Sequence, residues 1–335
     1  MTAGGVVEGM SLEQHWYRRD AVSLALLPLS WLFCAVAVLR RAAYGVGLLR
    51  QQRFAVPVIV VGNISVGGTG KTPLVAWLTT WLRREGYRPG VVSRGYGGAA
   101  RHWPQQVRAD SDPRMVGDEA VLLARRTACP MAVGPDRPAA VSALLQHSDC
   151  DVVVSDDGLQ HYALGRDVEI VVVDGERRFG NRRCLPAGPL REPQRRLSTV
   201  DLVVANGIAG PREYAMQLRP GSLHSLRDPA RHESLARFSG RRVHAVAGIG
   251  NPRRFFDLLR RHGLEVVEHP FADHHPLRAE DLEFADELPV LMTEKDAVKC
   301  QPFARDHHWY LPVEAEVDER IPQILLRLIG KKSDG

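Results

Sequence analysis

Lysine is scarce in this chain of 335 residues, which carries 44 lysine and arginine residues in total. Only five of them are lysines, at positions 71, 295, 299, 331 and 332. Lys71 lies inside the glycine-rich stretch GGTGKT, although nearly every other basic position is arginine. A planar guanidinium cannot replace a compact ammonium group beside a crowded phosphate. We therefore interpret Lys71 as a functional residue.

Cysteines are few and scattered, and the sequence contains no C-x-x-C pair. This pattern argues against a disulfide framework and a zinc site, and it favours a reducing compartment. The net charge of +5 is small, so it gives no argument for nucleic acid as a partner. It fits an anionic substrate or an anionic membrane surface. The length allows two modest domains, and the sequence shows no repeat of fixed period.

Charge is absent from residues 21–39, a run of 19 mostly apolar residues flanked by arginines. As a helix this run would be about 28 Å long, close to the thickness of a hydrocarbon core. No small-residue cleavage site follows it, which argues against a removed signal peptide. Pro28 leaves three interpretations open: a spanning helix, a helix in the membrane interface, and a buried core helix. The arginines that follow, between positions 40 and 53, place the next segment on the cytoplasmic side.

From residue 54 onward, continuous apolar runs alternate with helical patterns. Strands are expected within residues 55–63, 88–98, 150–161, 168–176 and 200–207, and helices over 73–84 and from 117. Such alternation predicts a parallel sheet that is covered on both faces.

A polar, irregular stretch at 219–239 interrupts this pattern and is expected to act as a hinge. The alternation then resumes as a second, smaller α/β unit. The last apolar helix could pack on either unit. The predicted division is an N-terminal membrane-associated helix region at 1–50, a larger α/β domain at 51–225, a smaller one at 236–315, and a C-terminal helix at 316–335.

The stretch VGNISVGGTGKTP at 61–73 follows an expected strand and precedes an expected helix, as phosphate-binding loops do. It departs from the G-x-x-x-x-G-K-[ST] pattern at one position, where Ser65 replaces the first glycine. The first turn must be made differently, and Gly62 is a candidate for it. Lys71 can reach the β- and γ-phosphates of a nucleotide, and Thr72 can place a hydroxyl on Mg²⁺. The expected nucleotide-binding residues are Ser65, Val66, Gly67, Gly68, Thr69, Gly70, Lys71 and Thr72.

Two carboxylates, Asp156 and Asp157, end the apolar run DVVVSDD. Beside a phosphate-binding loop, one of them can bind Mg²⁺ and the other can orient the metal or Lys71. A solvated turn is the alternative. The loop at 180–193 carries arginines and the acid Glu192, which is typical either of an ordered loop over an anionic ligand or of a plain connection.

Other acids and histidines have a structural explanation as well as a functional one. Asp118 and Glu119 begin a helix, where the helix dipole alone favours acids. His274 and His275 follow Asp273 at the end of a strand of the second unit, and a surface turn would account for them equally well.

Eight stretches of the sequence together resemble the tetraacyldisaccharide 4′-kinase family of Gram-negative bacteria. They are VGNISVGGTGKTP, VVSRGYGG, VGDEA, SDDGLQH, LPAGPLREP, GIGNPRRFF, FADHH and LMTEKDAVK. These stretches follow the family's order from residue 57 to about residue 300, and the apolar N-terminal segment is also in place. The family shares the atypical first turn of the glycine-rich loop.

The resemblance implies ATP-dependent phosphorylation of the 4′-hydroxyl of an acylated glucosamine disaccharide 1-phosphate, giving lipid IVA. It implies ATP and Mg²⁺ as cofactors and a location on the cytoplasmic face of the bacterial inner membrane. The implied fold is two P-loop-type α/β/α units with parallel sheets, joined by a short two-stranded hinge. Only the first unit is expected to have a working loop. No obligate protein partner is evident.

The resemblance also implies roles for individual residues. Asp118 would be the base that accepts the hydroxyl proton, with His274 as its partner from the second unit. The acids that would bind Mg²⁺ or order ATP are Asp156, Asp157 and Glu192. Arg191 would contact phosphate, and His161 is a further candidate. The family commonly has proline where this chain has Ala120, a departure expected to affect only the helix start.

Two other classes of function compete with this one. Membrane-associated switch ATPases of the cell-division and plasmid-partition type also contain GGxGKT, but they carry a lysine where this chain has Val66. A binding module with an inactive loop is disfavoured, because Lys71, Thr72 and the strand-end acids are all present.

Overall fold

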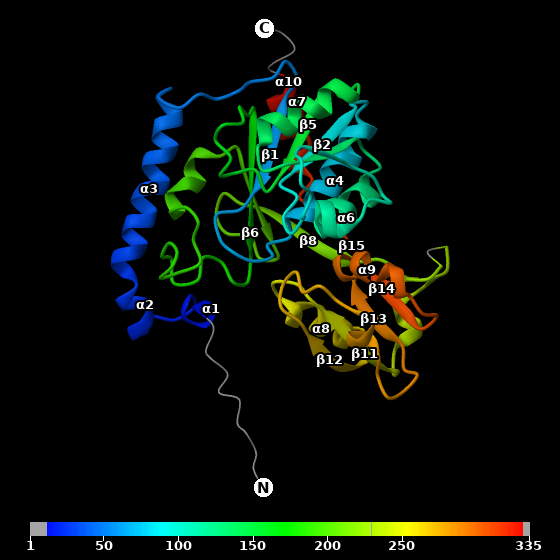
Figure 1. The fold of residues 1–335 in the computed structure, drawn as a ribbon. Helices are drawn as coiled ribbons and strands as arrows, with labels where there is room; N and C mark the ends of the chain where they lie inside the picture. The colour runs from blue at the N-terminus through cyan, green and yellow to red at the C-terminus, as the bar shows by residue number, and fades with distance from the viewer. Residues whose placement is uncertain (1–11, 229, 331–335) are drawn as a thin grey trace.

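The computed structural model describes residues 12–228 and 230–330. The ends of the predicted N-terminal and C-terminal regions lie outside these ranges. Within them the chain forms two sheets with helices packed on them, which confirms the predicted α/β fold (Figure 1). We call the nine-stranded sheet with its helices the first unit, and the six-stranded sheet with its helices the second unit.

The first sheet has the strand order β15-β8-β7-β6-β1-β5-β2-β4-β3. Its strands are β1 Val58–Gly62, β2 Pro89–Ser93, β3 Gln105–Val107, β4 Met131–Val133, β5 Val152–Asp156, β6 Val168–Asp174, β7 Leu202–Asn206, β8 Tyr214–Pro220 and β15 Val313–Val317. Neighbouring strands run parallel except at the two edges, where β3 and β15 are antiparallel to their partners. The continuous apolar runs predicted from the sequence are therefore central parallel strands.

Side chains of β1 alternate between two cores. Ile59 and Val61 face a core shared with three helices, whereas Val58 and Val60 face a core on the other side of the sheet. The three helices are α4 Lys71–Arg84, α6 Asp118–Thr127 and α10 Arg320–Gly330. The opposite core is covered by α7 Arg137–His147 and by the loop that carries Phe179, Cys184 and Leu190. The C-terminal helix, whose packing the sequence left open, thus packs on the first unit.

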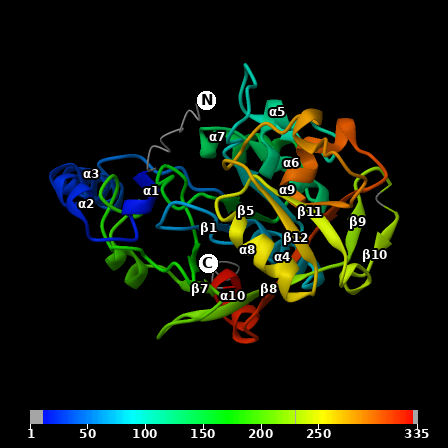
Figure 2. The same ribbon diagram turned by 90° about the horizontal axis from the view of Figure 1, so that it is seen from below.

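The second sheet has the order β10-β9-β14-β13-β11-β12. Its strands are β9 Leu223–Ser225, β10 His232–Glu233, β11 Arg242–Ala247, β12 Glu265–Pro270, β13 Val290–Thr293 and β14 His308–Leu311. Two α-helices accompany it, α8 Pro252–Arg261 and α9 Glu294–Cys300. Helix α9 lies against α6, so the two units meet near the first turn of α6 (Figure 2).

Two paired antiparallel strands, β8 and β15, connect the units. The chain leaves the first sheet after β8 and returns to it at β15, and Gly221 donates its N–H to the carbonyl of Pro312 at 2.9 Å. The polar stretch at 219–239, expected to be a hinge, contains the end of β8, then β9 and β10. The segment from β14 to β15 is divided between the two sheets at Pro312, which lacks the N–H that a strand interior needs.

The predicted N-terminal apolar helix is divided into α2 Ala21–Ala25 and α3 Leu27–Gly45, after a short α1 Leu12–His15. Pro28 lies in the first turn of α3, where its missing N–H costs little. By length and composition α3 could cross a membrane, and only 6% of its most apolar 18-residue segment is buried. Helix α3 flanks the first unit on the side away from α4 and α6 (Figure 1). The remaining short elements are α5 Pro113–Val116 and the 3-10 helices Gln194–Thr199, Leu235–Phe238, Ala279–Leu282 and Gln301–Phe303.

Candidate active site

The glycine-rich loop joins β1 to α4 at the carboxyl edge of the first sheet. Gly67 and Gly70 have φ angles of +104° and +96°, in the left-handed region that favours glycine. At Gly70 an added Cβ would also lie 2.6 Å from the side-chain nitrogen of Asn206. That nitrogen donates to the carbonyl of Thr69 at 3.1 Å, so β7 holds the end of the loop in place.

The first turn of the loop is braced by a distant segment in place of the missing glycine. Val66 donates its N–H to the carbonyl of Pro189 at 2.8 Å, and Arg191 donates its N–H to the carbonyl of Ile64 at 2.7 Å. Ser65 is buried and bridges to Leu190. In this conformation the N–H of Val66 is therefore engaged within the protein, and the N–H groups from Gly67 onward are left to meet a phosphate.

Lys71 begins α4 and lies beside Asp157, with 3.4 Å between its Nζ and Oδ1. Arg191 approaches the same carboxylate at 3.2 Å from the other side. Although burial opposes ionisation, Lys71 and Arg191 hold the pKa of Asp157 well below its usual range. Asp157 is thus an anion that holds two cations at the edge of the loop. Thr72 follows Lys71 as the second residue of α4.

Asp156 differs from its neighbour in both environment and charge. It ends β5, its side chain is buried, and its Oδ1 has no hydrogen-bond partner among the described residues. Burial, reinforced by the charge of Glu119, raises the pKa of Asp156 to about 7. A buried carboxylate oxygen without a donor fits a site that a cation completes.

Glu192 is already engaged by protein donors. It accepts hydrogen bonds from the amide of Gln160 at 2.8 Å and from the hydroxyl of Tyr162, and Arg196 lies 3.5 Å away. Its carboxylate lines the same cavity as Asp156. In this conformation the carboxylate of Glu192 is occupied by these donors. It therefore stabilises the wall of the site rather than being free to bind a metal.

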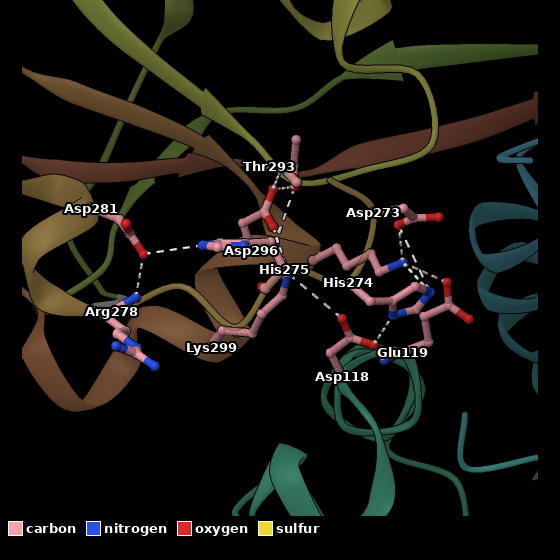
Figure 3. Close-up of polar contacts among 12 residues, drawn as sticks. Asp118, Glu119, Asp273, His274, His275, Arg278, Asp281, Thr293, Asp296 and Lys299 are labelled. Atoms are coloured by element: carbon pink, nitrogen blue, oxygen red, sulfur yellow. Dashed lines mark hydrogen bonds and ion pairs between the residues drawn. The ribbon is translucent and has the colours of Figure 1, made fainter. Parts of the chain in front are cut away.

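Asp118 and His274 meet across the two units. Asp118 begins α6 and is buried, and its Oδ1 lies 3.2 Å from Nδ1 of His274 (Figure 3). His274 follows β12 with a φ of +61°, which turns the chain at this point. The hydrogen bond to Asp118 raises the pKa of His274. Burial opposes ionisation of Asp118, but His274 and two nearby lysines lower its pKa.

Those lysines, Lys295 and Lys299, were not assigned a role from the sequence. Nζ of Lys295 lies 3.1 Å from Nε2 of His274, and Nζ of Lys299 lies 3.7 Å from Oδ2 of Asp118. Two signals pointed to them: the scarcity of lysine and the LMTEKDAVK stretch. Neither signal says which residues the two ammonium groups contact.

A cavity of about 470 Å³ extends from the apolar helix α3 to the acids at the end of β5. Phe33 and Val36 line one part of it, and Asp156 and Asp157 line another. His161 also lines it; burial, together with Arg137 and Arg94, lowers the pKa of His161 to about 4. One cavity thus joins an apolar wall to a polar, charged end.

The second unit also reaches the glycine-rich loop. An added Cβ at Gly250 would lie 3.0 Å from the backbone nitrogen of Gly68. Arg254 of α8 donates to the side-chain oxygen of Asn206 at 2.9 Å, the residue that holds Thr69. The loop is therefore in contact with both units in this conformation.

Comparisons with known proteins identify the family to which the chain is similar. A family model described as Tetraacyldisaccharide-1-P 4'-kinase matches residues 22–330. The Tetraacyldisaccharide 4'-kinase of Nitrosococcus oceani is 56% identical over 94% of this chain and 93% of its own length. The protein of that name from Methylobacillus flagellatus is 53% identical over 96% and 97%. A crystal structure of LpxK from Aquifex aeolicus in complex with ATP has a TM-score of 0.76 and 25% identity, covering 92% of this chain and 99% of the other. The chain belongs to the tetraacyldisaccharide-1-P 4′-kinase family.

Proposed function

We propose that this chain phosphorylates the 4′-hydroxyl of a tetraacylated glucosamine disaccharide 1-phosphate, with ATP as the donor and lipid IVA as the product. It is a kinase of lipid A biosynthesis, and its membership of the family gives no support to the switch ATPase alternative. The cavity that joins α3 to the strand-end acids carries the proposal. An acylated sugar phosphate needs this combination, because its chains are apolar and its reacting hydroxyl must reach a charged site.

ATP is expected to bind at the glycine-rich loop, with the N–H groups from Gly67 to Gly70 and the N-terminus of α4 around its phosphates. Lys71 would move from Asp157 to the β- and γ-phosphates. Arg191 would also move from Asp157 to contact the phosphates.

Mg²⁺ fits beside Asp156, whose buried Oδ1 has no donor within residues 12–228 and 230–330. The described residues contain no group of three His, Cys, Asp or Glu side chains placed to hold a metal alone, and Mg²⁺ usually takes one or two carboxylates plus phosphate oxygens. Asp156 and Thr72 would hold the ion, with Asp157 and Glu192 in supporting positions. When bound, Mg²⁺ neutralises charge on the β- and γ-phosphate oxygens.

Asp118 is proposed to accept the proton of the 4′-hydroxyl as the oxygen forms its bond to the γ-phosphorus. The bond between that phosphorus and the bridging β,γ-oxygen breaks, and ADP leaves. His274 would orient Asp118, because its Nδ1 lies 3.2 Å from the carboxylate.

The inner membrane surface is the proposed location, with α3 lying in the interface on the cytoplasmic side. Ser30 is the one buried residue of α3, and its hydroxyl donates to the carbonyl of Cys184 at 2.7 Å. This contact holds the helix along the first unit. Its outward face exposes large apolar side chains to the bilayer: Leu29, Trp31, Leu32, Phe33, Val36 and Leu39.

Incubation of the full chain with ATP, Mg²⁺ and the tetraacyl disaccharide 1-phosphate in detergent micelles tests the reaction. We expect one phosphate to be added, giving a bis-phosphorylated lipid by mass spectrometry, and the unacylated disaccharide to be a poor acceptor. ATP hydrolysis that does not depend on the acceptor, with no phosphorylated lipid, would contradict the proposal.

The membrane location has its own test. Removing residues 1–40 should release the protein from vesicles of anionic lipid. Any residual binding through the arginine-rich surface should be lost at high salt. A truncated protein that sediments with vesicles at high salt would show that the attachment lies elsewhere.

A further inference from the structure

Lys295 and Lys299 are one turn apart on α9 and project from the same face of that helix. Helix α9 belongs to the second unit, yet both ammonium groups reach the first turn of α6 in the first unit. Their side chains are only 13% and 10% exposed. Most basic positions in this chain are arginines. Two largely buried lysines where the units meet therefore need a specific explanation.

The ammonium group of Lys295 has three acceptors around it. Its Nζ lies 2.9 Å from Oε1 of Glu119, 3.0 Å from Oδ1 of Asp273 and 3.1 Å from Nε2 of His274. An ammonium group has three N–H donors and no acceptor, so all three donors are matched. One acceptor belongs to the first unit and the other two belong to the second.

The contact with His274 decides which ring nitrogen carries the proton. Because an ammonium group can only donate, Nε2 of His274 must be unprotonated and accept. The proton of the neutral ring then resides on Nδ1, which faces Oδ1 of Asp118 at 3.2 Å. We propose that Lys295 is a positioning residue: it fixes the tautomer and orientation of His274 toward Asp118. This inference rests on the proposed role of Asp118 and His274 in the kinase reaction.

Electrostatics support this geometry. Glu119, Asp118 and Asp273 outweigh the effect of burial and raise the pKa of Lys295, so it remains a cation throughout the working pH range. Its charge opposes protonation of His274, whereas Asp118 and Asp273 favour it. Lys299 lies 3.7 Å from Oδ2 of Asp118, and the ring of Tyr96 lies 4.8 Å from that of His274. Lys295 is thus a group in contact with His274 whose charge opposes protonation of the ring.

A simpler role for Lys295 would be to hold the two units together, and the chain provides a control for that role. Arg126 of α6 pairs with Glu294 of α9 at 2.9 Å, and their side chains are 15% and 18% exposed. This ion pair joins the same two helices with similar burial. It does not involve Asp118, His274 or Lys295.

The test compares K295M, K295R and R126M in the full chain, with kcat, both KM values and the pH profile of kcat as readouts. For K295M we expect kcat to fall about 10- to 100-fold with the KM for ATP nearly unchanged. The acid limb of its profile should move to higher pH, because His274 is then protonated more easily and leaves Asp118 a weaker base. R126M should keep kcat within about threefold and leave the acid limb in place.

K295R retains the charge but presents a planar fork in place of a single point donor. It should recover part of the lost kcat and show a nearly normal acid limb. If K295M does not fold, K295R still decides the question, since a simple link between the units predicts wild-type kcat for it.

Two results would overturn the inference: normal kcat in K295M, or equal losses in K295M and R126M with unmoved pH profiles. Both differ from failure of the proposed function, in which the wild-type chain itself would form no phosphorylated lipid.

Discussion

The two units contain the same local arrangement, a central parallel strand followed by a glycine-containing loop and a helix. In the first unit this is β1, the loop up to Gly70, and α4; in the second it is β11, the GIGN loop, and α8. The first loop has a lysine and a threonine at the start of its helix, and an acid without a donor on the neighbouring strand. The second has neither.

The second loop is filled by the protein's own carboxylate. Asp296 is fully buried and accepts the N–H of Gly248 at 2.9 Å. It also accepts from the hydroxyl of Thr293 at 2.6 Å and from Lys299 at 2.9 Å. An anion is therefore already present where a phosphate would otherwise meet the backbone. Under the proposed function, one copy of this architecture binds nucleotide and the other carries an acid–base group.

The most severe test of this comparison is Lys71→Ala. Because the charge on the β- and γ-phosphates matters most in the transition state, we expect kcat to fall at least about 100-fold. Thermal unfolding should be nearly unchanged, and Lys331→Ala serves as a lysine control. A folded Lys71→Ala protein with near-normal kcat would remove the distinction between the two loops.

The contribution of the second unit to the chemistry is tested by a double-mutant cycle. Asp118→Ala and His274→Ala should each lower kcat by about 100-fold, with ATP affinity little changed. If the two residues act as one pair, the double mutant should be scarcely worse than the poorer single mutant. Fully additive losses would mean independent roles, and His274 would then be better assigned to binding of substrate.

The filled loop of the second unit predicts an effect on stability rather than on nucleotide binding. Asp296→Ala removes a buried acceptor of three donors and leaves Lys299 without its partner at 2.9 Å. We expect the free energy of unfolding to fall by about 2–4 kcal/mol in urea titrations. The Kd for ATP should stay within about threefold. A large loss of ATP affinity would show that the second loop takes part in nucleotide binding.

The acid in the first unit gives a predicted effect that depends on pH. The pKa of Asp156 is raised to about 7 in the folded chain, above that of an unfolded aspartate. The folded state therefore binds this proton more tightly, and its contribution to stability is lost as pH rises from about 4 to about 7. Without Mg²⁺ and ATP, Asp156→Asn should raise Tm at pH 8 and change it little at pH 4.

With Mg²⁺ and ATP present at pH 8, the wild-type protein should have the higher Tm of the two. The reason is that the cation stabilises the ionised carboxylate of Asp156 and not the amide of Asp156→Asn. Differential scanning calorimetry with and without EDTA measures both effects. Equal Tm values for the two proteins at pH 8 under metal-free conditions would contradict the assignment of Asp156 as a buried acid with a raised pKa.

The sequence by itself determined the features whose determinants are contiguous. Consecutive backbone N–H groups bind phosphate, so the loop with Lys71 and Thr72 can be recognised in one short stretch. Apolar runs predicted the central strands, and eight stretches in order identified the family, which the comparisons confirm. The sequence also placed Asp156 and Asp157 together at one strand end, but it did not distinguish them. Tertiary contacts distinguish them: burial raises the pKa of Asp156, whereas Lys71 and Arg191 lower the pKa of Asp157 in spite of burial.

Tertiary structure alone decided the features that depend on contacts between distant segments. The turn at Ser65 is held by the carbonyl of Pro189, and the consecutive strands β14 and β15 belong to different sheets. Above all, Asp118 and His274 are 156 residues apart and meet only because α9 packs on α6. Local periodicity reports which face of an element is buried, but it carries no information about which other element buries it. The loop could therefore be predicted from a motif, whereas the pairing of Lys295, His274 and Asp118 required the packed fold.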